Sequence, residues 1–355
     1  MSLSTDGAGA AGPVPLRRKL LFWALLTALS VLFVEVVTNS APFAFFNPWG
    51  LLVTCPLYGL HVLVLARIVF LAPRVRLPLL FTAGAILGLY EAYITKVLWD
   101  PTWGWRLWTV GGVHVFQTAL LLLDAHPFMA FLLPLAVAEV FFTSSREIQV
   151  SLPGRLSRAL ETDQGRRRAM VALALYFGAY HALAAPPTLA VASAAAGTAF
   201  ALALGWLWRR SCAGAAITLR RLLPSGRQTG ALVALLALYY LLTGVFLRPQ
   251  SIPRTATPHV TILALYAVLF ALLWLGLRAA RGLAPPAIRA AGPACARGPW
   301  AAFAACFVVS SGLLSIAKPM AAVVTIASWV LFCAAGLALL AAAAVQAWHG
   351  LPRRR

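Results

Sequence analysis

Three glutamates lie inside long apolar stretches of this sequence: Glu35, Glu91 and Glu139. A carboxylate at the centre of a bilayer costs roughly 2.5–3.5 kcal/mol on insertion scales, so such acids are rare and are candidates for proton or substrate binding. All nine acidic residues occur before position 164, and the remainder of the chain contains no Asp or Glu. We therefore expect any chemistry in the N-terminal half.

Glu91 shares one helical face with two glycines. Gly84, Gly88, Glu91 and Thr95 are spaced at i, i+4, i+7 and i+11, which places them in one stripe of a helix. Glycines four residues apart let a neighbouring helix approach closely. The spacing predicts that Glu91 faces protein, and this favours a functional role for it. For Glu35 and Glu139, a protonated carboxyl that only bonds a neighbouring helix is an equal alternative.

Other polar side chains recur at helical spacing or gather in one loop. Tyr58 and His61 share a face of one apolar stretch, and His114 and Gln117 lie close together in another. Four tryptophans between positions 99 and 108 form either an interfacial belt or a platform for a sugar or lipid headgroup. The candidate catalytic residues are Glu35, Glu91, His114 and Glu139, and the candidate substrate-binding residues are Tyr58, His61, Glu91, Thr95, His114, Gln117, Trp103 and Trp105.

Neither a metal nor another cofactor is expected from the cysteines and histidines. The five cysteines form no C-x-x-C pair, and the histidines show no H-x-x-x-H or H-x-x-E spacing. His61, His114 and His181 each fit a hydrogen-bonded position in a helix interface better than a metal ligand. A zinc site and a disulfide framework are therefore not predicted.

Composition predicts the elements that must position these residues. The chain is 61% apolar and 11% charged, with a mean hydropathy of +0.85. Its uncharged stretches have the length that crosses a bilayer core of about 30 Å. An all-α, polytopic transmembrane bundle without a soluble domain is the expected fold. The expected stretches are 19–38, 49–70, 77–99, 107–123, 127–143, 169–185, 188–208, 230–247, 259–277, 299–316 and 320–348.

The basic residues predict the topology, because short cytoplasmic loops are enriched in Lys and Arg. Most of the 29 basic residues fall in six segments, which we expect on the cytoplasmic side with both termini: 17–19, 67–76, 146–168, 209–227, 278–297 and 353–355. One candidate stretch must then fail to cross. The short stretch 127–143 contains Pro134 and follows a tight link at 124–126, so we predict a re-entrant or half-buried helix there, and ten crossings.

The expected organisation follows from these spans. It comprises a cytoplasmic tail (1–18), a transmembrane half with the acidic and histidine residues (19–143), a basic cytoplasmic loop (144–168), a six-span scaffold (169–348) and a basic tail (349–355). The net charge of +20 does not indicate nucleic-acid binding, since the basic residues are distributed between apolar stretches. The expected partners are the bilayer, with basic loops at its anionic inner leaflet, and a small molecule or lipid. The sequence is compatible with a homo- or hetero-oligomer.

Three functions fit these features. The leading hypothesis is a small-molecule permease of the cytoplasmic membrane, coupled to protons through Glu91 with help from Glu35 and His114. The first alternative is a membrane-embedded enzyme that acts on a lipid or polyprenyl-linked substrate at the outer leaflet, with Glu91 or Glu35 as general base. The second alternative is an accessory or scaffold subunit whose Gly84/Gly88 face packs on another protein.

Overall fold

The computed structural model describes residues 13–212, 215–284 and 297–349 of the chain. Several features named in the sequence analysis lie outside these residues, namely much of each predicted tail, Cys295, the basic residues 353–355 and part of the basic segment 278–297. The described chain is almost entirely helical, and its strands β1 (Thr109–Val110) and β2 (Val113–His114) form one short antiparallel hairpin. The predicted all-α membrane fold is confirmed.

Long helical segments account for most of the described chain. Eight of them are long and apolar enough to cross a bilayer. Of the other two among the described residues, Leu77–Ala92 is apolar but shorter, and α8 begins with charged residues. In order, they are α1 (Leu16–Val31) with η1 (Leu32–Val36), η3 (Gly50–Thr54) with α2 (Cys55–Val69), α3 (Leu77–Gly88) with η4 (Leu89–Ala92), α4 (Val115–Leu120) with η5 (Leu121–Leu132) and α5 (Leu133–Phe142), α8 (Asp163–Ala184), α9 (Pro187–Cys212), α11 (Gly226–Tyr240) with η6 (Leu241–Leu247), α12 (Ala256–Ala280), α13 (Arg297–Ile316) and α14 (Lys318–His349).

Short helical turns occupy several of the connections between these segments. They are η2 (Ala44–Phe46), α6 (Glu147–Ser151), α7 (Gly154–Ala159), α10 (Leu219–Leu222) and η7 (Pro249–Ser251). The basic segment 144–168 therefore contains two short helices. Its first residues, from Ser144 to Gln149, are buried against the bundle, whereas α7 contains no buried residue.

The prediction of a separate re-entrant helix at 127–143 is wrong. Residues 115–142 form one continuous helical segment, and the predicted link at 124–126 lies inside it. Pro127 has no N–H to donate and would clash with the preceding turn of a regular α-helix. The segment accommodates it in the wider π-helical register of η5. Asp124 is consequently a buried residue of a helix interior, and it does not cap a helix end.

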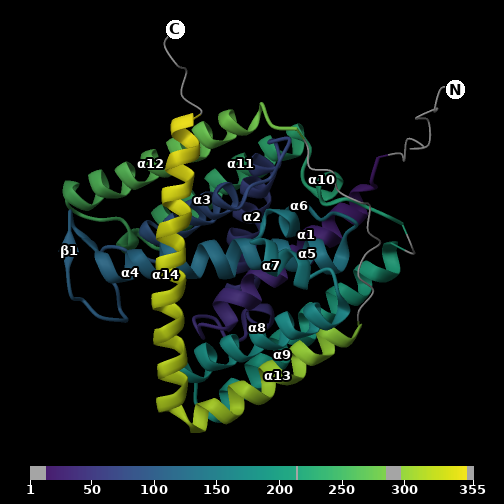
Figure 1. The fold of residues 1–355 in the computed structure, drawn as a ribbon. Coiled ribbons are helices and arrows are strands. Elements are labelled where there is room, and N and C mark those ends of the chain that lie inside the picture. Colours follow the sequence, from purple (N-terminus) through teal and green to yellow (C-terminus); the bar gives the residue numbers. More distant parts are fainter. Residues whose placement is uncertain (1–12, 213–214, 285–296, 350–355) are drawn as a thin grey trace, which may run out of the picture.

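The N-terminal helices form the centre of the molecule. Side chains such as Phe22, Phe33, Phe81 and Phe131 are fully buried there. Figure 1 shows α14 as the long yellow helix that runs from the top to the bottom of the view, with α8, α9 and α13 together at the bottom and α11 and α12 at the top. The apolar outer faces of α11 and α14 are largely exposed, as expected for helices that face lipid.

α3 packs tightly against η5 through its glycine face. A Cβ on Gly84 would lie 2.5 Å from Pro127 Cα, and one on Gly88 would lie 2.9 Å from the Leu121 carbonyl oxygen. Glu91, on the same face, is only 8% exposed. The prediction that this glutamate faces protein is confirmed.

The basic segments meet at one end of the bundle. There the guanidinium of Arg220 forms an ion pair with Glu147, with Nη2 at 2.5 Å from Oε2, and it donates to the carbonyl oxygens of Phe70, Ala72 and Pro73. Lys19 Nζ lies 3.4 Å from the Leu223 carbonyl oxygen. These contacts connect α1, the turn after α2, α6 and α10, and they close this end.

Candidate functional site

A cavity of about 650 Å³ lies at the other end of the bundle. Its walls come from η1 and the turn after it, η3 and the start of α2, η4, the start of η5 and the end of α8. The loop after α3 forms part of the rim. Gln117 Nε2 donates to the carbonyl oxygen of Trp103 at 2.8 Å and holds this loop beside the cavity.

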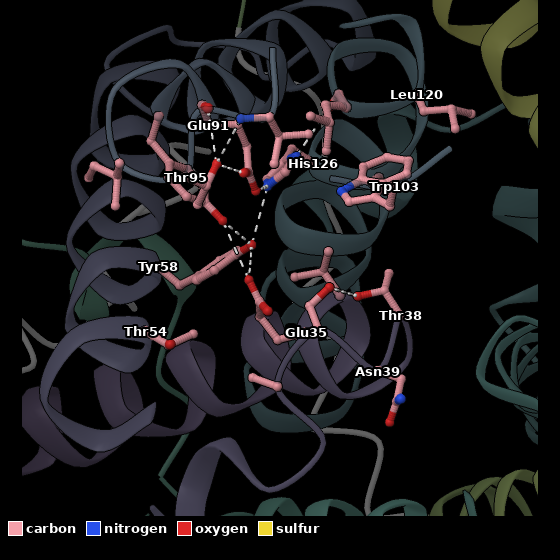
Figure 2. A pocket seen from close by; sticks show the side chains of 18 of the residues that line it. Glu35, Thr38, Asn39, Thr54, Tyr58, Glu91, Thr95, Trp103, Leu120 and His126 are labelled. Atoms are coloured by element: carbon pink, nitrogen blue, oxygen red, sulfur yellow. Dashed lines mark hydrogen bonds and ion pairs between the residues drawn. The ribbon is translucent and has the colours of Figure 1, made fainter. Parts of the chain in front are cut away.

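Glu35 and Glu91 both line this cavity, and a chain of hydrogen bonds joins them (Figure 2). The hydroxyl of Tyr58 lies 2.7 Å from Glu35 Oε1, 2.6 Å from the hydroxyl of Tyr90 and 3.2 Å from His126 Nε2. His126 Nε2 in turn lies 3.4 Å from Glu91 Oε1. Two carboxyls from different helices are thus connected through a phenol and an imidazole.

The tautomer of His126 determines the number of protons in this chain of hydrogen bonds. Its Nδ1 lies 3.3 Å from the Leu121 carbonyl oxygen, which only accepts hydrogen bonds, so this contact is a hydrogen bond in the tautomer that carries a hydrogen on Nδ1. A hydrogen bond between Nε2 and Glu91 then requires one further proton on either group. In that tautomer Glu91 and His126 can share a proton, as neutral imidazole with carboxylic acid or as imidazolium with carboxylate.

The second oxygen of Glu91 is held within its own turn. The hydroxyl of Thr95 makes a short hydrogen bond to Oε2 and also lies 3.0 Å from the Glu91 carbonyl oxygen. Just beyond the turn, Lys96 Nζ lies 2.5 Å from Asp100 Oδ2, and this contact lowers the pKa of the Asp100 carboxyl. Lys96 is therefore engaged in the rim loop and does not pair with Glu91.

The acidic and histidine residues of the cavity all lie on non-α turns. Glu35 belongs to the π-helical η1, His126 to the π-helical η5, and Glu91 to the 3-10 turn η4. Wider or tighter turns rotate side chains away from their ordinary α-helical directions, and π-turns often occur at functional sites. Here they direct three side chains from separate helices toward one hydrogen-bonded group.

The structure brings together only some of the predicted site residues. Glu35, Tyr58, Glu91, Thr95 and Trp103 line the cavity, whereas His61, His114, Gln117, Trp105 and Glu139 are not among its lining residues. The predicted partnership of His114 with Glu91 is therefore not formed.

Each of the other predicted residues has a different environment. His61 bonds the Leu57 carbonyl oxygen and the Tyr240 hydroxyl at 2.8 and 3.0 Å, in a helix interface. His114 lies in β2, 3.4 Å from the Thr109 hydroxyl. Trp105 packs on Phe116, with ring centroids 5.0 Å apart.

Glu139 lies near the basic end of the bundle. Its two carboxyl oxygens accept hydrogen bonds from the backbone N–H groups of Ile148 and Gln149, each at 2.9 Å. A carboxylate that receives the first N–H groups of a helix stabilises that helix start. The structure thus gives Glu139 a capping role for α6.

Sequence reasoning missed His126, Tyr90 and Arg248 as residues of the cavity. Tyr90 directly precedes Glu91, so the glutamate itself was the available signal. His126 lies in an apolar stretch that runs on through Pro127. Had that stretch been interpreted as one helix, His126 would have counted as an intramembrane histidine.

In the part of the chain that the structure describes, no three His, Cys, Asp or Glu side chains are grouped so as to hold a metal ion. Glu35, Glu91 and His126 are joined through Tyr58 and by the contact between His126 Nε2 and Glu91 Oε1, and this arrangement suits proton binding. What the site offers chemically is two carboxyls, an imidazole and two phenols, in contact with a partly open cavity.

Comparison with known proteins places this chain among membrane proteins. An uncharacterized protein of Archaeoglobus fulgidus is 39% identical over 171 residues, which cover 48% of this chain and 53% of that protein. The match thus spans about half of the relative's length. No solved structure matches the chain. A family model described as an uncharacterized membrane protein family matches residues 24–352, nearly the full length, and the chain therefore belongs to this family of integral membrane proteins.

Proposed function

We propose that this protein is a proton-coupled permease for a small solute, with Glu35 and Glu91 as its proton-binding groups. The observation that carries this proposal is the hydrogen-bonded connection between the two carboxyls, through Tyr58 and His126, at the wall of a solute-sized cavity. Intramembrane carboxyls and histidines are the usual components of proton pathways. Solute and proton binding are coupled when both use the same carboxyl groups.

The shape of the interior supports transport. The cavity reaches Tyr90 and Glu91 on η4, and every residue from Leu79 to Ala92 is buried. A second hollow, of about 360 Å³, lies at the basic end and is lined by Leu77 and Glu147 among others. Two hollows at opposite ends, separated by a packed core, fit a permease open to one side with its other side closed by Arg220 and Glu147.

The distribution of charge supports an orientation with the cavity facing outward. The described basic segments lie at the end of the bundle opposite the cavity, and such segments remain cytoplasmic in multi-pass proteins. We propose that the protein resides in the cell membrane with both termini in the cytoplasm. The unpaired apolar faces of α11 and α14 would contact lipid.

Labelling of single cysteines tests this orientation. In a background with the five natural cysteines replaced by serine, Thr109→Cys in the exposed hairpin should react with a membrane-impermeant maleimide on intact cells. Arg155→Cys, on the exposed α7, should react only after the cells are permeabilised. Labelling of Arg155→Cys on intact cells would reverse the orientation and would place the cavity on the cytoplasmic side.

Proton coupling can be measured before the solute is identified. Purified protein is reconstituted into vesicles that contain a pH-sensitive dye, and cationic, anionic, zwitterionic and neutral solutes are added outside in turn. At least one class should shift the internal pH in protein vesicles but not in empty ones. Glu35→Gln should remove the shift, while Glu161→Gln, on an exposed turn, should retain it. The absence of a shift with every class would refute the permease and favour an accessory subunit.

A membrane-embedded enzyme is the second candidate, and the Glu91–His126 pair is the observation that favours it. A carboxyl and an imidazole 3.4 Å apart can act together as a general acid–base pair. Incubation of the reconstituted protein with labelled lipid extract, followed by chromatography, distinguishes the two functions. A new lipid product that requires His126, together with no solute-driven pH shift, would favour the enzyme.

A further inference from the structure

We propose that the solute of this cavity is an organic cation, which displaces the proton from Glu35 or Glu91 when it binds. This inference rests on the proposed permease function and adds the chemical class of the substrate. The volume of about 650 Å³ is typical of sites for small organic ligands, and an inorganic ion would leave most of it empty.

The charges that line the cavity favour a cation. Among the described residues, no Lys or Arg forms an ion pair with Glu35 or Glu91. The imidazole of His126 is already bonded to Glu91. Arg248, the remaining basic lining residue, lies with its guanidinium 5.9 Å from the ring centroid of Trp49. The two carboxyls of the cavity therefore have no ion-pair partner among the Lys and Arg residues that the structure describes.

The walls of the cavity are rich in aromatic rings. Its lining residues include three tryptophans and three tyrosines, namely Trp49, Trp103, Trp329, Tyr58, Tyr90 and Tyr180. Aromatic faces attract cations, and this attraction is strongest where water is excluded. In Figure 2, Trp103 lies across the pocket from Tyr58, with Glu35 below them. Aromatic walls beside these two carboxyls would bind a desolvated organic cation, including one that has no hydrogen-bond donors.

Binding of the cation is an exchange that conserves charge. A protonated Glu35 or Glu91 gives up its proton, through Tyr58 or His126, to the open side of the cavity. The resulting carboxylate forms an ion pair with the incoming cation. Because one carboxyl cannot hold a proton and pair with the cation at the same time, one cation enters for each proton that leaves.

Tetraphenylphosphonium is a suitable probe, because tetraphenylborate has the same shape and the opposite charge. Binding of each is measured to the purified full-length protein in detergent by equilibrium dialysis, from pH 5 to pH 8. Tetraphenylphosphonium should bind, with an affinity that falls by up to about tenfold per pH unit as the solution becomes more acidic, as expected for competition with one proton. About one proton per bound cation should be released into weakly buffered solution.

Variants locate the binding in this cavity. Glu35→Gln and Glu91→Gln should each weaken tetraphenylphosphonium binding and flatten its pH dependence, and Glu161→Gln should not. Trp103→Ala should weaken it by about 3- to 30-fold, the range expected for a partly desolvated cation–aromatic contact. Trp108→Ala is the matched control, since Trp108 is exposed and does not line the cavity. A single symmetric peak in gel filtration confirms that each variant is folded.

The outcomes separate this inference from the proposed function. Equal binding of tetraphenylborate, or cation binding without proton release, would overturn the cation site. A pH shift in vesicles driven only by anionic or neutral solutes would retain the permease and refute the substrate class. Cation binding with proton release but without any transport would retain the cation site and refute the permease. Displacement of the probe by short-chain phosphatidylcholine, but not by tetramethylammonium or tetraethylammonium, would identify a lipid headgroup as the source of the cation.

Discussion

Replacing Glu91 by glutamine should abolish proton-coupled uptake, with a loss of about 100-fold or more, while the amount of folded protein stays nearly unchanged. Glutamine has the size of glutamate and can keep a hydrogen bond to Thr95. It cannot share a titrating proton with His126, which lies 3.4 Å from Glu91. The solute-driven pH shift in vesicles and the yield of monodisperse protein are measured on the same preparation.

Glu161→Gln is the matched control for Glu91→Gln, because it makes the same chemical change on an exposed turn. A purely structural Glu91 would give a different result. If it were protonated and only joined helices, glutamine would replace it at little cost, since hydrogen bonds between membrane helices average about 0.6 kcal/mol. Full activity in Glu91→Gln would therefore refute the role of Glu91 as a proton-binding or catalytic group, and would leave it a structural role.

The position of Glu91 was predictable because it depends on local spacing. Two glycines at i and i+4 leave a groove on one side of a helix, and the neighbouring helix enters that groove whatever the rest of the fold is. Gly84 and Gly88 meet Pro127 and Leu121 in this way. The fold class was equally predictable, since length and apolarity alone decide which stretches can form membrane helices.

The histidine partner was not predictable, because it depends on how Pro127 is accommodated. A proline within an apolar stretch ordinarily ends or kinks a helix, and the pattern therefore indicates a link before it. Instead η5 continues through Pro127 in π-register, and α3 packs beside it at Gly84. Tertiary packing thus keeps His126 inside the bundle, next to Tyr58 and Glu91. His114, at a similar place in the sequence pattern, lies in the hairpin.

Partners that helical spacing does not reveal determine the roles of other polar residues. His61 bonds Tyr240, which is 179 positions away. Glu139 receives N–H groups from α6, a helix too short for the hydrophobic pattern to reveal. Neither pairing leaves a periodic signal in one sequence. The sequence therefore indicates which polar residues lie in the membrane and need hydrogen-bond partners. The fold determines which of them line a cavity.

The two halves of the chain contribute differently to the cavity. The N-terminal half supplies the carboxyls and the histidine, all on turns that depart from α-helical geometry. The C-terminal helices contribute Tyr180, Arg248 and Trp329 to the cavity and otherwise surround it with apolar surface. The absence of acidic residues after position 163 fits this division, since a carboxylate on a lipid-facing helix would only add cost.

The contact between α3 and η5 holds the cavity together, and its loss should have the second large effect. Replacing Gly84 by alanine should lower stability by about 1–3 kcal/mol, the usual cost of overpacking, and replacing it by leucine should prevent folded protein from accumulating. The reason is that a Cβ at position 84 would lie 2.5 Å from Pro127 Cα, a backbone atom that moves only if the two helices separate. Thermal unfolding in detergent and the yield of monodisperse protein measure the effect.

Gly230 on α11 provides the control for this test, because nothing lies within 4 Å of a Cβ placed there. Gly230→Ala should be neutral or stabilising, since alanine favours a helix over glycine by up to about 1 kcal/mol. Gly230→Leu should also fold. Comparing the stability changes at the two sites separates the effect of helix contact from that of helix propensity, because both glycines lie within helices and receive the same substitutions. If Gly84→Leu were as stable as Gly230→Leu, α3 and η5 would not be in contact at this face. Glu91 would then lose the packing that directs it toward His126, and the proposed site would fail with it.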